Sequence, residues 1–122
     1  MGTLCFGMEY LMRQTIISWI HELKLKHGFA DPKKIAQKEK LRVWTIEDGC
    51  NNWDARLVKK DCSYLILVNR VKPRVRRNYA IAHELIHWLI KRHMPDSLPQ
   101  GDQLERLCDV GAHELLFGEE SL

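Results

Sequence analysis

The stretch that decides the fold is NYAIAHELIHWLIKRH, residues 78–93. Its apolar residues recur every three or four positions, which is the spacing of a helix with one buried face. Pro95 follows two residues after this stretch and is typical of the point where a helix has ended. The sequence therefore predicts a half-buried helix over residues 78–93.

Two further helices are predicted before this stretch and one after it. Apolar residues recur at helical spacing over residues 9–26, and Gly28 then supplies a C-terminal stop. Asp31 and Pro32 are typical of the N-cap and first residue of a short second helix. The last helix is expected over residues 102–117.

Three segments between these helices have the pattern of strands. Residues 41–47 alternate between apolar and polar and lead into a turn signal at Gly49, while residues 53–59 and 63–69 follow as two more runs. The last run is the most apolar in the chain. We expect a small, three-stranded, mostly antiparallel sheet packed with helices, an α+β fold in a single domain over residues 1–122.

Composition places the chain among ordinary soluble proteins. Of its 122 residues, 45% are hydrophobic and 29% are charged, and no run approaches the roughly 20 apolar residues that a membrane span needs. The N-terminus lacks the pattern of a secretory signal, so we expect a cytoplasmic protein that does not enter a membrane. Its four cysteines should then be reduced, with a Cys50–Cys62 bridge as the alternative.

Basic residues gather in residues 70–77, although the formal net charge is only +3. The preferred interpretation is a solvated connection that leads into the next helix. The alternative is a patch for an acidic partner or for DNA. Neither aromatic interleaving nor helix-turn-helix spacing accompanies the stretch, so direct nucleic-acid binding is not expected.

The motif that carries chemistry is His83-Glu84-Leu85-Ile86-His87, or H-E-x-x-H. Residues four apart on a helix lie about 40° apart around its axis, so both imidazoles project from one face and can reach one ion at about 2.0–2.1 Å. Glu84 lies beside them, where it can take a proton from a water on the ion. We predict one Zn²⁺ ion, with manganese or another divalent ion as an alternative. Two hydrogen-bonded core histidines are the competing interpretation.

A catalytic zinc site needs a third protein ligand, and two residues compete for that place. Glu105 is preferred because Asp109 follows one helical turn later and can accept the N–H of a ligand histidine. The alternative for both acids is a water-facing position near a helix N-terminus. His93 has the spacing of an extended H-E-x-x-H-x-x-G-x-x-H motif, but Ile90 stands where that motif needs glycine.

Residues 78–87 resemble the aromatic-x-x-A-H-E-L-G-H signature of the ImmA/IrrE metallopeptidase family, with Ile86 in place of its glycine. Residues 105–116 resemble its E-x-x-A-N-x-F-A-x-E-L-L segment, in which Cys108 and Gly111 replace alanine and phenylalanine. The resemblance implies a zincin-like minimal metallopeptidase domain with a gluzincin-like ligand set. It carries over Glu105 as the third ligand and places Asp109 at the asparagine of the family.

The resemblance also implies the function that we expect: a zinc-dependent endopeptidase that performs limited proteolysis of a specific cytoplasmic protein, such as a helix-turn-helix repressor. An extended substrate would add as a strand to the sheet, with Leu65 and Leu67 in the template strand. The alternative function is a non-catalytic, metal-binding module that sequesters a regulatory protein. In that case His93, Cys108 or His113 would close a four-ligand shell.

Overall fold

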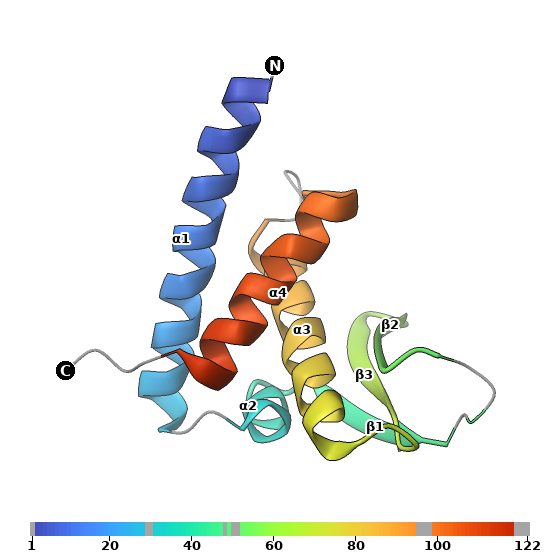
Figure 1. The fold of residues 1–122 in the computed structure, drawn as a ribbon. Helices are drawn as coiled ribbons and strands as arrows, with labels where there is room; N and C mark the ends of the chain where they lie inside the picture. The colour runs from blue at the N-terminus through green and yellow to red at the C-terminus, as the bar shows by residue number, and fades with distance from the viewer. Residues whose placement is uncertain (1, 29–30, 48, 50–51, 95–98, 119–122) are drawn as a thin grey trace.

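The computed structural model describes residues 2–28, 31–47, 49, 52–94 and 99–118. Within these residues the fold is α+β, with four helices and a three-stranded mixed sheet. The elements are α1 (Gly2–His27), α2 (Pro32–Lys38), β1 (Arg42–Ile46), β2 (Ala55–Lys60), β3 (Ser63–Asn69), α3 (Arg74–His93) and α4 (Gly101–Phe117). Figure 1 shows the long α1 and α4 on one side of α3 and the sheet on the other.

The sheet has the order β1-β3-β2, so the predicted antiparallel arrangement is wrong in one of its two pairings. β2 and β3 form an antiparallel hairpin, whereas β1 pairs parallel with β3. The physical reason is burial, because β3 carries the most apolar sequence and a strand covered on both sides suits the centre of a sheet. The chain between Ile46 and Ala55 is long enough to carry β2 past the place that β3 occupies.

This order also corrects the predicted template for a substrate strand. Leu65 pairs with Arg42 on one side and Val58 on the other, and Leu67 is likewise paired on both sides. A strand that has two neighbours leaves no backbone groups for a third. Leu65 and Leu67 are therefore in the wrong strand for that role, and the free edges of the sheet belong to β1 and β2.

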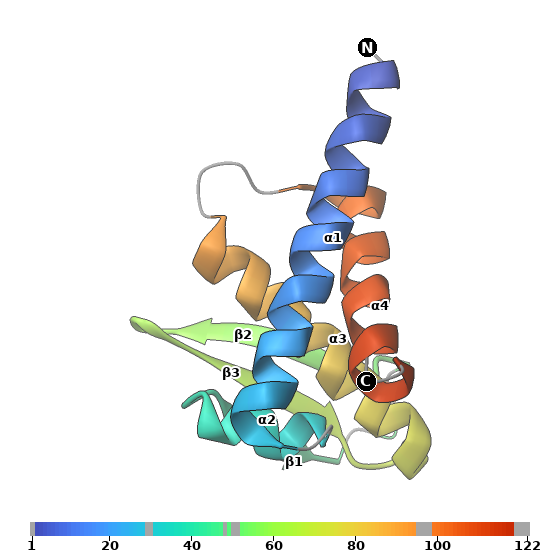
Figure 2. The same ribbon diagram turned by 90° about the vertical axis from the view of Figure 1, so that its left-hand side faces the viewer.

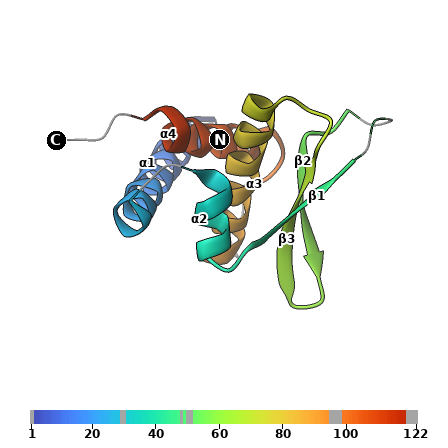
Figure 3. The ribbon, with the colours of Figure 1, turned by 90° about the horizontal axis from the view of Figure 1, so that it is seen from below.

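The hydrophobic core lies where α3 meets α1, α4 and β3. Figures 2 and 3 show α3 enclosed between the α1–α4 pair and the sheet, with α2 beside one end. α3 buries one apolar face along its length, as its periodicity predicts. Fully buried side chains come from each of these elements and include Ile16, Ile20, Ile35, Ile66, Leu85, Ile86, Ile90, Leu107 and Leu115.

Two helices begin earlier than their apolar pattern predicts. α3 begins at Arg74, directly after Pro73, whose φ of −58° already suits a helix. The side chains of its first three residues are exposed, so this turn contributes no apolar repeat. α1 begins at Gly2, and its N-terminal half exposes Tyr10 and Leu11. In both helices the apolar periodicity predicts only the part of the helix that packs against the core.

The second helix agrees with its prediction. Asp31 is the N-cap of α2, and its side chain accepts hydrogen bonds from the backbone N–H groups of Lys33 and Lys34. Pro32 is the first helical residue and is buried. The described helices include none with the length and apolar content to cross a membrane.

The basic residues of 70–77 lie where the chain leaves β3 and enters α3. Arg76 forms an ion pair with Asp54 at 2.8 Å, and Arg70 lies 3.8 Å from Glu47. The stretch is thus a connection into a helix with some of its charge already paired, which agrees with the preferred interpretation.

Candidate metal centre

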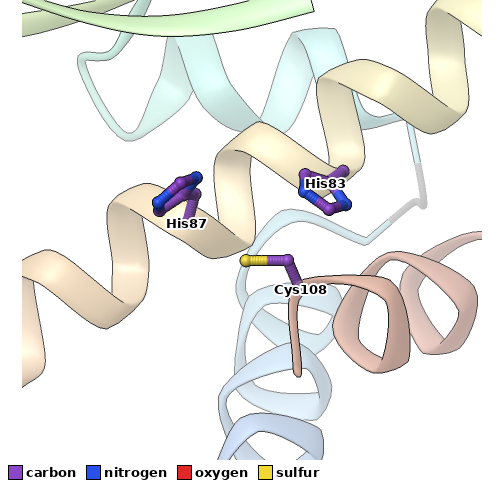
Figure 4. A group of neighbouring side chains, drawn as sticks. All are labelled: His83, His87 and Cys108. Carbon is purple, nitrogen blue, oxygen red and sulfur yellow. The ribbon is translucent and has the colours of Figure 1, made fainter. Parts of the chain in front are cut away.

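His83 and His87 lie one turn apart on α3, and Figure 4 shows both rings near Cys108 of α4. Their ring centroids are 6.4 Å apart and the two rings are nearly perpendicular. Both side chains are mostly enclosed, with exposed fractions of 15% and 21%. The motif therefore places two imidazoles in a partly buried, polar space between two helices, as its spacing predicts.

α4 brings two carboxylates to the ring of His83. Oε1 of Glu105 lies 3.1 Å from Nε2, and Oδ1 of Asp109 lies 2.9 Å from Nδ1. A neutral imidazole carries one N–H, so only one of these carboxylates can accept a proton from the ring in that form. If Asp109 accepts from Nδ1, the lone pair of Nε2 faces the Glu105 oxygen. A cation between Nε2 and that oxygen would satisfy both atoms.

The distance between Nε2 and Glu105 fits such a cation. Two donors on a tetrahedral zinc ion, at about 2.0–2.2 Å each, lie roughly 3.4 Å apart. The observed separation of 3.1 Å is close to that value. The structure thus brings Glu105 and Asp109 to His83. Glu105 does not belong to the group of ligand atoms that lie within 4.8 Å of one another, which is formed by His83, His87 and Cys108. The roles of Glu105 and Asp109 toward a metal stay a prediction.

Tyr79 extends the contact between α3 and α4, and the sequence analysis did not assign it a role. Its hydroxyl donates to the same Oδ1 of Asp109 at 3.0 Å. Burial, together with the hydrogen bond and charge of Asp109, raises the pKa of Tyr79 to about 12. The hydroxyl therefore stays protonated at neutral pH and remains a donor. Its position four residues before His83, on the same helix face, was the available signal.

Glu84 is held between α3 and the sheet. Its Oε1 accepts the backbone N–H of Leu57 in β2 at 3.1 Å and lies 3.4 Å from Nδ1 of His87. The second contact lacks hydrogen-bond geometry, because Nδ1 of His87 is buried without a hydrogen-bond partner. A buried ring nitrogen without a hydrogen-bond partner is available to bind another group.

Cys108, predicted only as one of three residues that could close a structural site, lies beside both histidines. One ligand atom from each of His83, His87 and Cys108 lies within 4.8 Å of the others, and Figure 4 shows the thiol reaching from α4 toward the two rings. Cys108 is fully buried. Burial, and next the negative charge of Glu105, Glu84 and Asp109, raises the pKa of its thiol well above the usual range.

The alternatives His93 and His113 do not join this group. The ring of His93 packs against Trp19 with centroids 4.7 Å apart, and His113 is exposed beside Phe117. Neither belongs to the cluster of candidate metal-binding residues in the described part of the chain. The described geometry therefore gives no support to a ligand role for either residue.

Gly111 sets how closely α4 approaches α3. A Cβ atom at this position would lie 2.6 Å from Cγ1 of Ile86 and 2.9 Å from Cγ2 of Ile16. Gly111 is one turn beyond Cys108, so the close approach occurs beside the polar cluster. A large residue on α3, Ile86, thus faces a residue without a side chain on α4.

The cysteines were expected to be reduced, with a Cys50–Cys62 bridge as the alternative. Cys62 and Cys108 are free thiols, the first exposed and the second buried. Cys50 lies outside the described residues, so the alternative of a Cys50–Cys62 bridge falls on a part of the chain that the structure does not describe.

The donor set as a whole fits a divalent cation. Two imidazoles, one thiol and the carboxylates of Glu84, Glu105 and Asp109 come from two facing helices. Nitrogen, sulfur and carboxylate oxygen are the ligands that zinc takes in proteins. The surrounding negative charge favours a cation. Comparison with known proteins adds no relative, since no family model, curated protein or solved structure matches the chain.

Proposed function

We propose that the protein is a zinc-dependent endopeptidase that performs limited proteolysis of a specific cytoplasmic protein. The observation that carries the proposal is the pair of contacts on His83, which place one carboxylate at each ring nitrogen. In catalytic zinc sites with two histidines and one glutamate, a carboxylate is the third ligand, and a further acceptor, often a carboxylate, orients a ligand histidine.

His83, His87 and Glu105 would hold the ion, and Asp109 would keep the proton of His83 on Nδ1. Zn²⁺ supplies a Lewis acid there, which lowers the pKa of a bound water toward about 7 and polarises a carbonyl. The Tyr79 hydroxyl holds Asp109 in place from the other side. These hydrogen bonds would hold the side chains of His83 and Asp109 in fixed orientations beside the ion.

Glu84 would act as the general base. Its carboxylate lies beside His87 and next to the edge of β2, where a peptide and a water can meet. Glu84 accepts the proton of the attacking water and later delivers a proton to the leaving amine. The backbone N–H of Leu57 orients the Glu84 carboxylate through its hydrogen bond and takes no part in the proton transfers.

The substrate would pair with the free edge of β2. The amide of Leu57 donates to Glu84 rather than to β3, so Leu57 belongs to the residues whose backbone groups point away from β3. Backbone direction alternates along an antiparallel strand, so Ala55 and Lys59 present their groups to the same edge. An extended peptide on this edge lies next to Glu84.

The resemblance to the ImmA/IrrE family supports a transcriptional repressor as the class of substrate. Backbone pairing with β2 accepts many sequences, so selection of one protein would depend on docking outside the bound strand.

Glu84→Gln tests the proposal. The change keeps the shape of the side chain and its acceptor oxygen but removes the base, so the protein should retain its metal and lose cleavage of an unfolded substrate such as casein by about 10²-fold or more. Glu22→Gln is the matched control, since Glu22 is exposed on α1. Full activity in the Glu84 variant would remove this residue from the base role and contradict the mechanism.

One observation favours the alternative, a non-catalytic metal-binding module. Cys108 lies within reach of the ion position and could complete a shell of four protein ligands, which is typical of structural sites. A purified protein that holds its zinc but cleaves neither casein nor a peptide library would support this second function.

A further inference from the structure

Three donors line the face of α4 that meets α3. Cys108 and Asp109 follow Glu105 by three and four residues, so helical geometry stacks them on one side of α4. Of these, Glu105 and Asp109 contact His83, whereas the thiol of Cys108 lies near the ligand atoms of both histidines. Cys108 is thus the α4 residue most central to the pair of imidazoles.

The separations lie within reach of coordination. On a tetrahedral zinc ion, with about 2.3 Å to sulfur and about 2.0–2.1 Å to nitrogen, these atoms lie roughly 3.6 Å apart. The three ligand atoms are now within 4.8 Å of one another. Rotation of side chains about single bonds can close a gap of this size without moving either helix.

The surroundings of Cys108 do not suit an ordinary core thiol. A buried cysteine usually packs as a small apolar side chain among other apolar groups. Cys108 is fully buried, yet it lies beside two imidazoles and near the carboxylates of Glu84 and Glu105. Nδ1 of His87 is buried here without a hydrogen-bond partner, so the space contains a polar atom that a further bound group could satisfy.

We propose that the Cys108 thiolate is a protein ligand of the ion held by His83 and His87, and that the site therefore selects a thiophilic divalent cation. The inference rests on the metal site of the proposed function and adds the class of metal. In a catalytic site Cys108 would take the place of Glu105 as the third protein ligand, so that a water can hold the fourth position. Thiolate ligands favour zinc over magnesium, calcium and manganese, which prefer oxygen. A site of two histidines and one carboxylate, without a thiolate, would discriminate less between zinc and these oxygen-preferring cations.

Cobalt substitution tests this ligand directly, because a thiolate bound to Co²⁺ gives a charge-transfer absorption in the near ultraviolet that nitrogen and oxygen ligands do not. The protein loaded with one equivalent of Co²⁺ should show this band. Cys108→Ser should lose it, while Cys62→Ser should keep it, since Cys62 is exposed on the β2–β3 turn. Circular dichroism of each variant establishes that the fold is retained.

Metal competition gives the second readout. We expect Cys108→Ser to lose more than about tenfold in zinc affinity and to narrow the preference for zinc over manganese. A cobalt-loaded protein without the band, or a band that persists in Cys108→Ser, overturns the proposal. If the band is present and Cys108-dependent but no cleavage is found, the ligand assignment stands and the endopeptidase assignment fails.

Discussion

His83 is the residue that joins the candidate site together. Its ring meets Glu105 at one nitrogen and Asp109 at the other, so one side chain of α3 contacts two positions of α4. When Asp109 accepts the proton of Nδ1, the lone pair of Nε2 points toward Glu105. Glu105 and Asp109 could be predicted from their spacing on a helix, because residues four apart share a face.

The contributions of Leu57 and Tyr79 could not be predicted in the same way. Leu57 acts through its backbone N–H, and a backbone donor leaves no mark on the side-chain pattern. Tyr79 was visible as an aromatic residue four positions before His83, yet its partner Asp109 lies 30 residues further along the chain. Such a pairing depends on how α3 and α4 pack.

Gly111 lies where α4 packs tightly against α3. In Gly111→Ala the new Cβ would meet Ile86 and Ile16 at distances below 3 Å, so we expect a loss of about 1–3 kcal/mol in the free energy of unfolding. Urea denaturation measures the effect. Gly7→Ala is the control, because a Cβ at this exposed helical position meets nothing within 4 Å and should leave stability unchanged or slightly raised.

The cost of Gly111→Ala should be smaller in an Ile86→Ala background than in the unmodified protein, since Ile86→Ala removes atoms that the new methyl group meets. Equal stability of Gly111→Ala and the unmodified protein would show that α3 and α4 do not approach each other as closely as described here.

β2 is the element whose role the structure changes most. The sequence pattern shows that residues 55–60 form a strand, but strand order is decided by which partners bury the most apolar surface. β3, as the most buried strand, takes the centre, and β2 becomes an edge next to Glu84. This arrangement moves the predicted substrate template from Leu65 and Leu67 to the outer side of β2.

A pair of proline substitutions tests the edge role. Lys59 presents its backbone groups to the free edge, whereas Val58 pairs through its backbone with β3. Lys59→Pro should therefore keep the fold but weaken substrate binding, seen as a raised KM. Val58→Pro removes a ladder hydrogen bond and leaves its carbonyl partner unsatisfied, so it should destabilise the protein by about 1–3 kcal/mol. An unchanged KM in a folded Lys59→Pro protein would exclude this edge as the template.

At the scale of the whole molecule, the helices were more predictable than the arrangement of the sheet. α2 has the expected cap, and α3 and α4 end where they were expected to end, because caps and breakers are local signals. The parallel pairing of β1 with β3 is a non-local feature, and the residues of β1 alone do not predict which strand it pairs with. Likewise, the proximity of Cys108 to two histidines follows from the α3–α4 packing that Gly111 permits.

The central claim is that α3 and α4 together form one metal site around His83 and His87. Elemental analysis of the purified protein after dialysis against metal-free buffer measures it most directly. We predict about one zinc per chain in the unmodified protein, loss of that zinc in His87→Gln, and its retention in His113→Gln, where the histidine is exposed beside Phe117. Zinc that persists in His87→Gln, or that is absent from the unmodified protein after zinc has been supplied, would contradict the account.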